Sequence, residues 1–353
     1  MRQENVKVII WGFGSMGSGM AKMLLKKEGI EIVGVIDGWD KLVGKGIFEI
    51  LDVDGNGKED VVVTHVDKKD EVIKPGAADV VLLATDSFTA KAFDKMKFIM
   101  ENKLNCITTA EQMAYPQAQE PELAKELDEI AKANGVSLLG TGINPGLIMD
   151  YLVLVLSGAC EEVDHITAKR INSLSPFGPA VMEEQGVGFT VEKFNDLNDK
   201  GELAGHVGFE ESVGMMAEAI GWELDEPVRT SKEAIVSSVY RKAPYAEVQA
   251  GDVAGVNMLG FGKIGGEDKI EMIHPQQVEP ELEGVDTGDY IIIKGEPNIS
   301  MAITPEVPGG IGTIAMIVNS IPNIINATPG LKTMVDLPAP HAMMGDVRKL
   351  IHE

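Results

Sequence analysis

Residues 6–17, VKVIIWGFGSMG, lead from a run of mostly β-branched residues directly into the glycine-rich hexapeptide GFGSMG. The apolar run predicts a strand buried on both faces, as in a parallel sheet, and the apolar residues up to Leu25 predict a helix after the hexapeptide. In a G-x-G-x-x-G between strand and helix, the first glycine allows the tight turn, the second lets the backbone approach a pyrophosphate, and the third lets helix and strand pack closely. The stretch therefore predicts a dinucleotide-binding fold, with the phosphates held by N–H groups of the helix start. The predicted cofactor loop consists of Gly12, Phe13, Gly14, Ser15, Met16 and Gly17.

An acidic residue follows the hexapeptide at the distance typical of a ribose ligand. The segment EIVGVIDG forms a second apolar run that reaches Asp37, about twenty residues after the last glycine. A carboxylate there accepts a hydrogen bond from the ribose 2′-OH and repels a 2′-phosphate, so Asp37 favours NAD. Lys41 and Lys45 lie close enough in the sequence to pair with a 2′-phosphate. We therefore predict NAD as the preferred cofactor, while use of NADP stays open.

The length and composition are those of a two-domain globular protein. The chain has 353 residues, of which 44% are hydrophobic and 24% charged, and a chain of this length commonly divides into two domains. No apolar stretch approaches the length of a membrane-spanning helix, and the N-terminus enters the first predicted strand without a signal-peptide pattern. Cys106 and Cys160 lie far apart in apolar or small-residue surroundings, which predicts reduced, buried thiols. We expect a cytoplasmic protein.

The formal net charge of −24 restricts the partners. A phosphate backbone or an anionic membrane surface would be repelled, so we expect no nucleic-acid and no membrane partner. An anionic dinucleotide must rely on local backbone donors. The acidity is compatible with a cationic small substrate, and an equally good interpretation is that it keeps the protein soluble.

Strand and helix patterns alternate over the first 140 residues. This order predicts an α/β fold whose N-terminal domain is a Rossmann-type, doubly wound parallel sheet. Further along, several strand-like segments follow one another without a helix between them, which predicts a second α+β domain on a mixed or antiparallel sheet. The segment LIMDYLVLVLSG, residues 147–158, predicts a buried linking helix. We place the dinucleotide-binding domain at 1–148, completed by 306–353, and a substrate-binding and dimerisation domain at 149–305.

Two loops after predicted strands of the first domain carry polar residues. Ligands of doubly wound sheets bind at the carboxyl ends of the strands. Thr85 and Asp86 follow the fourth predicted strand, and Thr109 and Glu111 follow the fifth. In both loops a helix-capping role competes with ligand binding. We predict that Thr85, Asp86 and Thr109 bind the cofactor and that Glu111 is a candidate catalytic carboxylate.

Residues 140–146, GTGINPG, form the most unusual of these loops. Three glycines, an asparagine and a proline before a very apolar segment predict a rigid loop with exposed backbone N–H groups, and an interdomain hinge is the alternative. Asp150 follows in that segment, where a carboxylate is costly unless it is solvated, paired or functional. The predicted substrate ligands of the loop are Thr141, Asn144, Pro145 and Gly146, and Asn144 is also a predicted cofactor ligand.

Two candidates for binding an anion lie later in the chain. Arg170 ends a predicted strand and could hold a carboxylate bidentately, although a surface salt bridge is the commoner role of such an arginine. The segment PGGIGT at 308–313 precedes an apolar helix, which makes Gly310 and Thr313 candidates for a second anion pocket. The histidines are scattered without metal-ligand spacing and no G-x-S-x-G motif is present, so we expect neither a metal site nor a serine hydrolase. The chemistry is then that of the cofactor, which is hydride transfer.

Three stretches, GFGSMG, GTGINPGLIMD and GGIGTIAMIVNSIPNIINATPGL, together make the chain similar to the 2,4-diaminopentanoate dehydrogenases of the dihydrodipicolinate reductase-like group. The resemblance runs along essentially the whole chain and is most specific in GTGINPG. It implies NAD(P)-dependent oxidation of the C4 amine of (2R,4S)-2,4-diaminopentanoate to 2-amino-4-oxopentanoate and ammonia, in anaerobic ornithine breakdown, and a homodimer. Dihydrodipicolinate reductases proper carry adjacent histidines, which this sequence lacks. We therefore do not expect the biosynthetic reduction.

Oxidation of an amine needs a group that takes up its proton, because an ammonium nitrogen has no lone pair. Our candidates for this group are Glu111 and Asp150, followed by His206 and His274. The substrate must also be held by its carboxylate, for which Arg170 and the PGGIGT segment are the candidates. Two other interpretations stay open: another dehydrogenase of the same architecture, of aspartate or homoserine type, and a protein that senses NAD without turnover.

Overall fold

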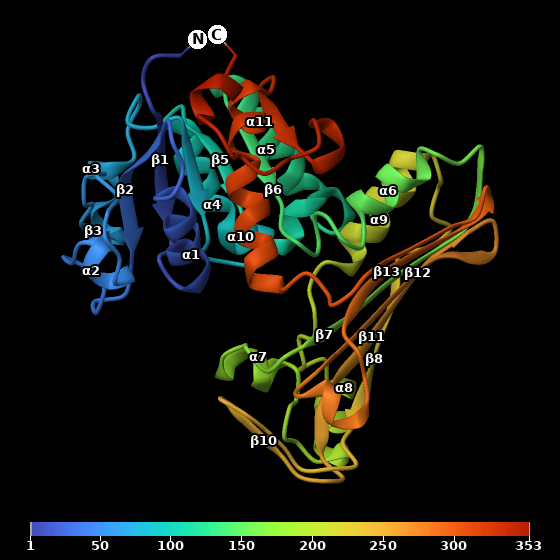
Figure 1. Ribbon diagram of the computed structural model, residues 1–353. Helices are drawn as coiled ribbons and strands as arrows, with labels where there is room; N and C mark the ends of the chain where they lie inside the picture. Colours follow the sequence, from blue (N-terminus) through green and yellow to red (C-terminus); the bar gives the residue numbers. More distant parts are fainter. Residues whose placement is uncertain (1, 353) are drawn as a thin grey trace. The chain divides into compact units, whose positions relative to one another are not determined.

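The structure is a computed structural model that describes residues 2–352, and these residues form two compact units (Figure 1). The first unit comprises residues 2–147 and 309–352, and the second comprises Ile148–Pro308. The C-terminal segment thus belongs to the same unit as the N-terminal residues. None of the helices in the described range has both the length and the apolar character needed to span a membrane.

The first unit is built on a seven-stranded sheet in which every neighbouring pair of strands is parallel. The strand order is β15-β6-β5-β4-β1-β2-β3, which contains the order 3-2-1-4-5-6 of a doubly wound dinucleotide-binding sheet. The strands are β1 (Val6–Trp11), β2 (Ile30–Asp37), β3 (Val63–His65), β4 (Val80–Leu83), β5 (Asn105–Thr108), β6 (Ser137–Gly140) and β15 (Gly330–Lys332). This confirms the Rossmann-type sheet that the apolar runs and their spacing predict.

Helices connect these strands and pack against the sheet. The helices are α1 (Ser15–Leu24), α2 (Ile47–Leu51), α3 (Lys69–Val72), α4 (Thr89–Glu101), α5 (Pro121–Asn134), α10 (Gly309–Asn319) and α11 (Ile321–Asn326). The short 3₁₀ helices are η1 (Val66–Lys68), η2 (Glu111–Ala114), η3 (Pro116–Ala118), η5 (Met334–Asp336) and η6 (Val347–Leu350). Helix α10 packs against α1, and the two approach so closely that a Cβ at Gly19 would lie 2.2 Å from Cδ1 of Ile314. The start of α10 is thereby held beside the helix that follows the glycine-rich loop.

The second unit is built on a mixed sheet of six strands, with the order β14-β13-β7-β12-β11-β8. Only the pair β7 and β12 is parallel among its described pairs, so the predicted mixed sheet is confirmed. The strands are β7 (Glu162–Ser173), β8 (Arg229–Val236), β11 (Val253–Ile264), β12 (Glu267–Gln277), β13 (Gly288–Glu296) and β14 (Ile299–Ile303), with a separate hairpin of β9 (Arg241–Ala243) and β10 (Ala246–Val248). The helices are α6 (Tyr151–Ser157), α7 (Pro179–Glu184), α8 (Val191–Asp199), α9 (Phe209–Ile220) and η4 (Pro280–Glu283).

The two faces of this mixed sheet have different surroundings. Helix α9 packs on the face that carries Gly260 and Gly262, where a Cβ would lie 2.6 Å from Phe209 and 2.7 Å from Val213. We call this the inner face. The opposite, outer face carries apolar side chains that are half-buried or exposed, namely Leu259, Phe261, Ile273, Tyr290 and Ile292.

The linking helix differs from its prediction. Residues 145–150 form turns, and α6 begins only at Tyr151. Val153 is the one buried residue of α6, whereas Val155 is 53% exposed. The prediction of a long buried helix was therefore wrong, because the turns before Asp150 shorten the apolar segment and one side of what remains faces solvent.

The two cysteines are free, but only one is buried. Cys106 lies on β5 with both neighbouring strands around it, so its thiol is fully buried. Cys160 lies in the connection between α6 and β7 and is half-buried. The prediction of a buried thiol was right for Cys106 and wrong for Cys160, because the connection that carries Cys160 lies partly at the surface.

Candidate active site

Four loops of the first unit leave the same edge of the parallel sheet. Strands β4, β1, β5 and β6 form parallel neighbouring pairs, so the loops after them all start at the carboxyl edge. Hydrogen bonds tie the loops together: the Gln112 N–H donates to the Ser87 carbonyl over 3.1 Å, and the Thr89 N–H donates to Oε1 of Gln112 over 2.9 Å. The structure thus gathers the polar loops in one place within the first unit, as ligand binding by such a sheet requires.

The three glycines of the hexapeptide have different surroundings. Gly12 has φ +95°, and a Cβ there would lie 2.4 Å from the Ala84 carbonyl oxygen. A Cβ at Gly17 would lie 1.9 Å from the Gly12 carbonyl oxygen, so this glycine allows α1 to pack close to the turn. Gly14 has an ordinary φ of −71°, and nothing lies within 4 Å of a Cβ placed on it. Its lack of a side chain therefore serves no internal contact and leaves the start of α1 open, which fits a dinucleotide pyrophosphate.

The carboxylate of Asp37 is fixed beside this loop. Its Oδ2 accepts a hydrogen bond from the Phe13 N–H over 2.6 Å, and its Oδ1 accepts one from the Trp39 N–H over 2.7 Å. The Phe13 side chain itself is buried, so this residue contributes through its backbone. Trp39 is 55% exposed, and Nζ of Lys41 lies 5.2 Å from its ring centre. An exposed indole next to the ribose-binding position suits stacking on adenine, and the sequence analysis missed it although its place two residues after Asp37 was a signal.

The loop after β4 forms a local network. Oγ1 of Thr85 donates to Oδ2 of Asp86 over 2.6 Å, and Nζ of Lys95 on α4 contacts the same oxygen over 2.5 Å. Thr85 is exposed, while Asp86 is half-buried. The ion pair fixes Asp86 to α4, which leaves the exposed Thr85 as the more accessible ligand candidate of the two.

Glu111 is the carboxylate of the loop after β5. It is the first residue of η2 and is half-buried. Thr109 precedes it, is also half-buried, and donates its N–H to the Leu83 carbonyl over 3.0 Å. The next residue, Gln112, forms the bonds to the neighbouring loop described above. Glu111 is therefore held at the carboxyl edge by a backbone that is bonded on both sides.

The GTGINPG loop is buried and bonded to α10. Thr141, Asn144, Pro145 and Gly146 are all buried. The Ile143 N–H donates to Oγ1 of Thr313 over 3.2 Å, and a Cβ at Gly310 would lie 3.5 Å from Cε of Met16. The start of α10 therefore contacts both this loop and the glycine-rich loop, within the first unit. Two motifs that lie far apart in the sequence meet here, and their N–H groups suit an anion.

Asp150, at the start of the second unit, is fully buried. It is the N-cap of α6 rather than a residue inside that helix: its Oδ1 accepts from the Tyr151 N–H over 2.6 Å. Its Oδ2 accepts from Oγ of Ser212 on α9 over 2.8 Å. Oδ1 thus caps α6 and Oδ2 ties it to α9, which explains why a carboxylate is tolerated in this apolar segment.

Arg170 of the second unit forms a buried ion pair, not the surface salt bridge that the sequence leaves as an alternative. Its Nη1 lies 2.5 Å from Oδ1 of Asp289, and its Nη2 donates to the Val307 carbonyl over 2.6 Å. The side chains are 3% and 0% exposed. Burial raises the pKa of Asp289, and the Arg170 charge opposes that rise. Two guanidinium nitrogens are therefore already engaged within the protein.

Two histidines that lie far apart in the sequence meet in the second unit. The ring centres of His206 and His274 are 4.7 Å apart, and Nε2 of His274 lies 3.0 Å from Oδ1 of Asn172. Burial, the nearby His206 and the charge of Arg170 lower the pKa of His274 well below its ordinary value, so its ring is neutral. Sequence spacing gave no signal for this pair. Among residues 2–352, no group of three or more His, Cys, Asp or Glu side chains is arranged to hold a metal ion.

Comparison with known proteins gives one family over the whole chain. Residues 147–353 match the family model that is described as the 2,4-diaminopentanoate dehydrogenase C-terminal domain. The chain is 63% identical over 350 residues to the 2,4-diaminopentanoate dehydrogenase of Acetoanaerobium sticklandii, covering 99% of this chain and 98% of that protein. It is 22% identical to an amine dehydrogenase of Streptomyces virginiae, covering 94% and 96% of the two chains.

A solved structure extends this result. The amine dehydrogenase of Mycobacterium smegmatis superposes with a TM-score of 0.84 at 26% identity, covering 97% of this chain and 99% of that one. Both units are therefore shared with an amine-oxidising relative. Taken with the dinucleotide-binding sheet and the match along 99% of the sequence, the chain belongs to the 2,4-diaminopentanoate dehydrogenase family of NAD(P)-dependent amino-acid dehydrogenases.

Proposed function

We propose that this protein oxidises the C4 amine of (2R,4S)-2,4-diaminopentanoate to 2-amino-4-oxopentanoate and ammonia, as a step of anaerobic ornithine breakdown in the cytoplasm. The observation that carries the reaction class is the carboxyl edge of the parallel sheet, where Gly14 leaves the start of α1 open and Glu111 supplies a carboxylate. The substrate is supported by the family to which the whole chain belongs.

The cofactor supplies one part of the chemistry, because bound NAD(P)⁺ accepts the hydride that leaves C4 of the substrate. The residues that fit it are the N–H groups at the start of α1, Asp37 and the exposed Thr85. We extend the cofactor contacts to Thr109 and Asn144 in the neighbouring loops. Water then supplies the keto oxygen and the nitrogen leaves as ammonia, so that atoms and charge balance.

Glu111 takes up the proton of the C4 ammonium, which frees the lone pair that expels the hydride. The carboxylate is half-buried and its backbone is fixed by Gln112, as general acid–base work requires. Asp150 acts as a positioning residue of the second unit, because both of its oxygens already accept hydrogen bonds. His274 is a weaker candidate, since its Nε2 is engaged by Asn172.

The substrate also needs fixed contacts away from C4. The start of α10, with Gly310 and Thr313, offers N–H groups with no acidic residue in its first turn. The GTGINPG loop that Thr313 holds provides the remaining contacts of the first unit. Arg170 contributes a buried positive charge whose direction is set by Asp289.

Substitution of Glu111 tests the reaction. We expect Glu111→Gln to lower kcat by about 10²- to 10⁴-fold, the usual contribution of a general base, in an assay of NADH absorbance with 2,4-diaminopentanoate. Glu122→Gln, at an exposed carboxylate in the first turn of α5, is the matched control and should keep the wild-type rate. Asp150→Asn should lower the melting temperature and change kcat only slightly.

A near-wild-type rate for Glu111→Gln would remove this carboxylate from the mechanism. Tight NADH binding by the wild-type protein without amine-dependent turnover would instead support the NAD-sensing alternative. A panel of diamino and monoamino acids separates the proposed substrate from the aspartate- and homoserine-type alternatives.

We further propose that NAD is preferred to NADP. Asp37 is held by two backbone N–H groups in a position where its charge opposes a 2′-phosphate. Lys41, the nearest cation in the sequence, lies over the Trp39 ring, and its charge still allows some use of NADP. The Michaelis constant for NAD should be lower than that for NADP. Asp37→Ser should narrow the difference between these two Michaelis constants. A lower constant for NADP with Asp37 intact would contradict the preference.

We propose that two copies of the chain form a homodimer through the outer face of the mixed sheet. Leu259 and Ile273 are register partners at its centre, and Ile292 is 42% exposed on β13. Lys169 of β7 lies in register between Ile273 and Tyr290, so the face combines apolar and charged side chains, as interfaces between proteins commonly do. A second copy is the occupant that this face fits, because the same face is available on both partners.

A further inference from the structure

Helix α4 begins at Thr89 without a cap of its own. Its N-cap position is occupied by Phe88, whose side chain accepts no hydrogen bond, and Thr89 is fully buried, so its N–H is out of reach of bulk water. The partner comes from another loop: the Thr89 N–H donates to Oε1 of Gln112 over 2.9 Å. A local serine, threonine or aspartate at position 88 is the usual way to cap a helix start. The use of a glutamine that lies 23 residues away therefore calls for a reason other than the helix itself.

Gln112 belongs to the short 3₁₀ helix η2, which starts at Glu111. Its side chain caps α4, and its own N–H donates to the Ser87 carbonyl over 3.1 Å. Gln112 is 7% exposed, so the hydrogen bond of its side chain is shielded from water. The two contacts lie on either side of Phe88 and hold the turn at two points, one through the backbone and one through the side chain. The residue next to this double attachment is Glu111.

The loop on the other side of these contacts is itself fixed. Residues 84–88 connect β4 to α4 and include Thr85, our proposed cofactor ligand. Asp86 accepts a hydrogen bond from Oγ1 of Thr85 over 2.6 Å and is paired with Lys95 on α4. Gln112 therefore connects two fixed parts of the carboxyl edge, namely the loop that carries a proposed cofactor contact and the turn that carries the proposed base.

We propose that Gln112 is a positioning residue that keeps the Glu111 carboxylate in register with the β4–α4 loop and thereby with the bound cofactor. The inference rests on the proposed function, in which Glu111 takes up the proton of the C4 ammonium, and it adds the residue on which the place of this base depends. Gln112 acts through Glu111, because its Oε1 and its N–H are both engaged within the protein. A displacement of about 1 Å in a reacting geometry can lower a rate by about 10²-fold. Loss of the Gln112 contact should therefore lower the rate of hydride transfer.

A single substitution at Gln112 separates cofactor binding from the chemical step. Gln112→Met keeps the length of the side chain but offers no strong acceptor, so the Thr89 N–H loses its partner. Rapid mixing of the NAD-loaded protein with 2,4-diaminopentanoate measures the first turnover of NADH formation. We expect the rate constant of this turnover to fall by about 10- to 100-fold. Its amplitude, which counts the molecules able to react, and the NAD dissociation constant from calorimetry should stay close to the wild-type values.

Three further variants test the chemical reason for the loss. Gln112→Glu keeps an oxygen acceptor for the Thr89 N–H at a helix start, where a negative charge is favoured, and should recover most of the rate constant. Gln117→Met makes the same change at an exposed glutamine of the neighbouring η3 and should react like the wild type. If Gln112→Met does not fold, Gln112→Asn should show the lowered rate constant, because its carbonyl oxygen is one methylene group short of the Thr89 N–H.

The failures are distinguishable. A wild-type protein that does not oxidise 2,4-diaminopentanoate contradicts the proposed function, and a near-wild-type rate for Glu111→Gln contradicts the choice of the base. If the wild type is active and Glu111→Gln is slow, a wild-type rate constant for Gln112→Met overturns this inference alone. A lower amplitude or weaker NAD binding at an unchanged rate constant also overturns it, because that result indicates a structural role. An equally slow Gln112→Glu contradicts the hydrogen bond to Thr89 as the cause.

Discussion

Gly14 and Gly17 belong to one loop, yet their neighbours give them different tasks. A Cβ at Gly17 would lie 1.9 Å from the Gly12 carbonyl oxygen, whereas a Cβ at Gly14 would meet nothing within 4 Å. The motif spacing predicts both glycines without distinguishing their roles. The distances separate a glycine that the fold needs from one that no contact within the protein requires.

This difference gives a prediction at the scale of single residues. Gly14→Ala should keep the stability of the wild type within about 0.5 kcal/mol, as for a surface substitution, and weaken NAD binding at least about tenfold because the Cβ occupies the pyrophosphate position. Gly17→Ala should lower the free energy of unfolding by about 1–3 kcal/mol, the range of overpacking. Thermal unfolding and titration calorimetry with NAD measure the two effects. Strong destabilisation by Gly14→Ala would contradict the proposed division of roles.

Single residues also mark where inference from the sequence ends. Asp150 was identified as a carboxylate in an apolar segment that needed a reason, and Arg170 as an arginine that could hold a carboxylate. Their partners, Asp289 and Ser212, lie 119 and 62 residues away in the chain. No local pattern connects residues so far apart, so the ion pair and the N-cap contact could be found only in the folded chain.

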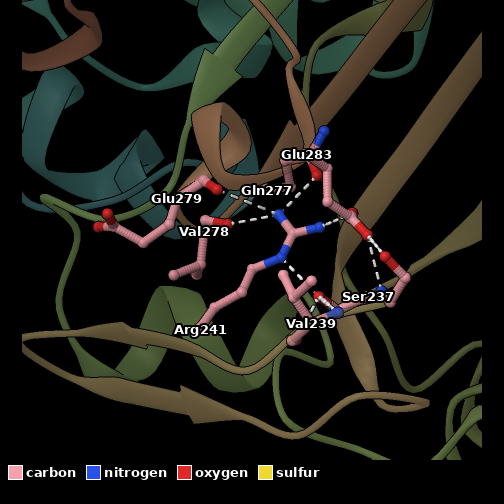
Figure 2. A network of polar contacts seen from close by, with 8 residues as sticks. Ser237, Val239, Arg241, Gln277, Val278, Glu279 and Glu283 are labelled. Carbon is pink, nitrogen blue, oxygen red and sulfur yellow. Dashed lines mark hydrogen bonds and ion pairs between the residues drawn. The ribbon is translucent and has the colours of Figure 1, made fainter.

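At the scale of elements, a buried arginine holds the β9–β10 hairpin in place (Figure 2). Arg241 is fully buried, and its Nε donates to Oγ of Ser237 over 2.6 Å. Its Nη1 donates to Oε1 of Gln277 over 2.8 Å and to the Val278 carbonyl over 2.7 Å, and its Nη2 is paired with Glu283. The network joins the hairpin to the end of β12 and to η4. The sequence analysis gave Arg241 no role, because its partners belong to other elements.

The network predicts a pH dependence of stability. Hydrogen bonds from Ser238 and the charge of Arg241 lower the pKa of Glu283 in the folded protein. A lowered pKa stabilises the fold at pH values above the unfolded pKa, about 4.3, and this contribution is lost as the pH falls through the folded pKa. Glu283→Gln should therefore be less stable than the wild type at pH 7, and the difference should shrink in the acid range.

Urea unfolding at a series of pH values measures this difference. Glu281→Gln is the matched control, since Glu281 is an exposed carboxylate on the same η4 turn. The free energy of unfolding of Glu281→Gln should stay close to that of the wild type at every pH. A Glu283→Gln difference that is equally large at pH 7 and at pH 3 would show that the carboxylate charge contributes nothing.

For the whole molecule, the open outer face of the mixed sheet is the feature with the largest consequence. We expect Leu259→Glu combined with Ile273→Glu to convert the proposed dimer to a monomer, because two buried carboxylates without partners disfavour an apolar interface. Light scattering after gel filtration measures the mass. Val62→Glu, at a residue of the first unit that is 56% exposed, should leave the dimer intact. A monomeric wild type, or a dimer that survives both outer-face substitutions, would contradict this interface.

The sequence by itself determined the doubly wound sheet, the glycine-rich loop and the acidic residue beside it. The reason is that apolar periodicity and motif spacing are local: Val6 to Gly17 contain both the buried strand and the turn that follows it. The mixed character of the second sheet also followed from local patterns, since strand-like segments without helices between them exclude parallel crossovers.

Only the tertiary structure decided which polar residues of the second unit meet. Asn172 and His274 are 102 residues apart in the chain and share a hydrogen bond of 3.0 Å. Their contact depends on the pairing of β7 with β12, whose register is set by the burial of the whole inner face and not by any segment alone. The folded chain likewise brought the GTGINPG loop to Thr313 on α10. Sequence motifs predicted the cofactor loop because it lies within one strand, one turn and one helix, whereas the contact between Asn172 and His274 is built across strands.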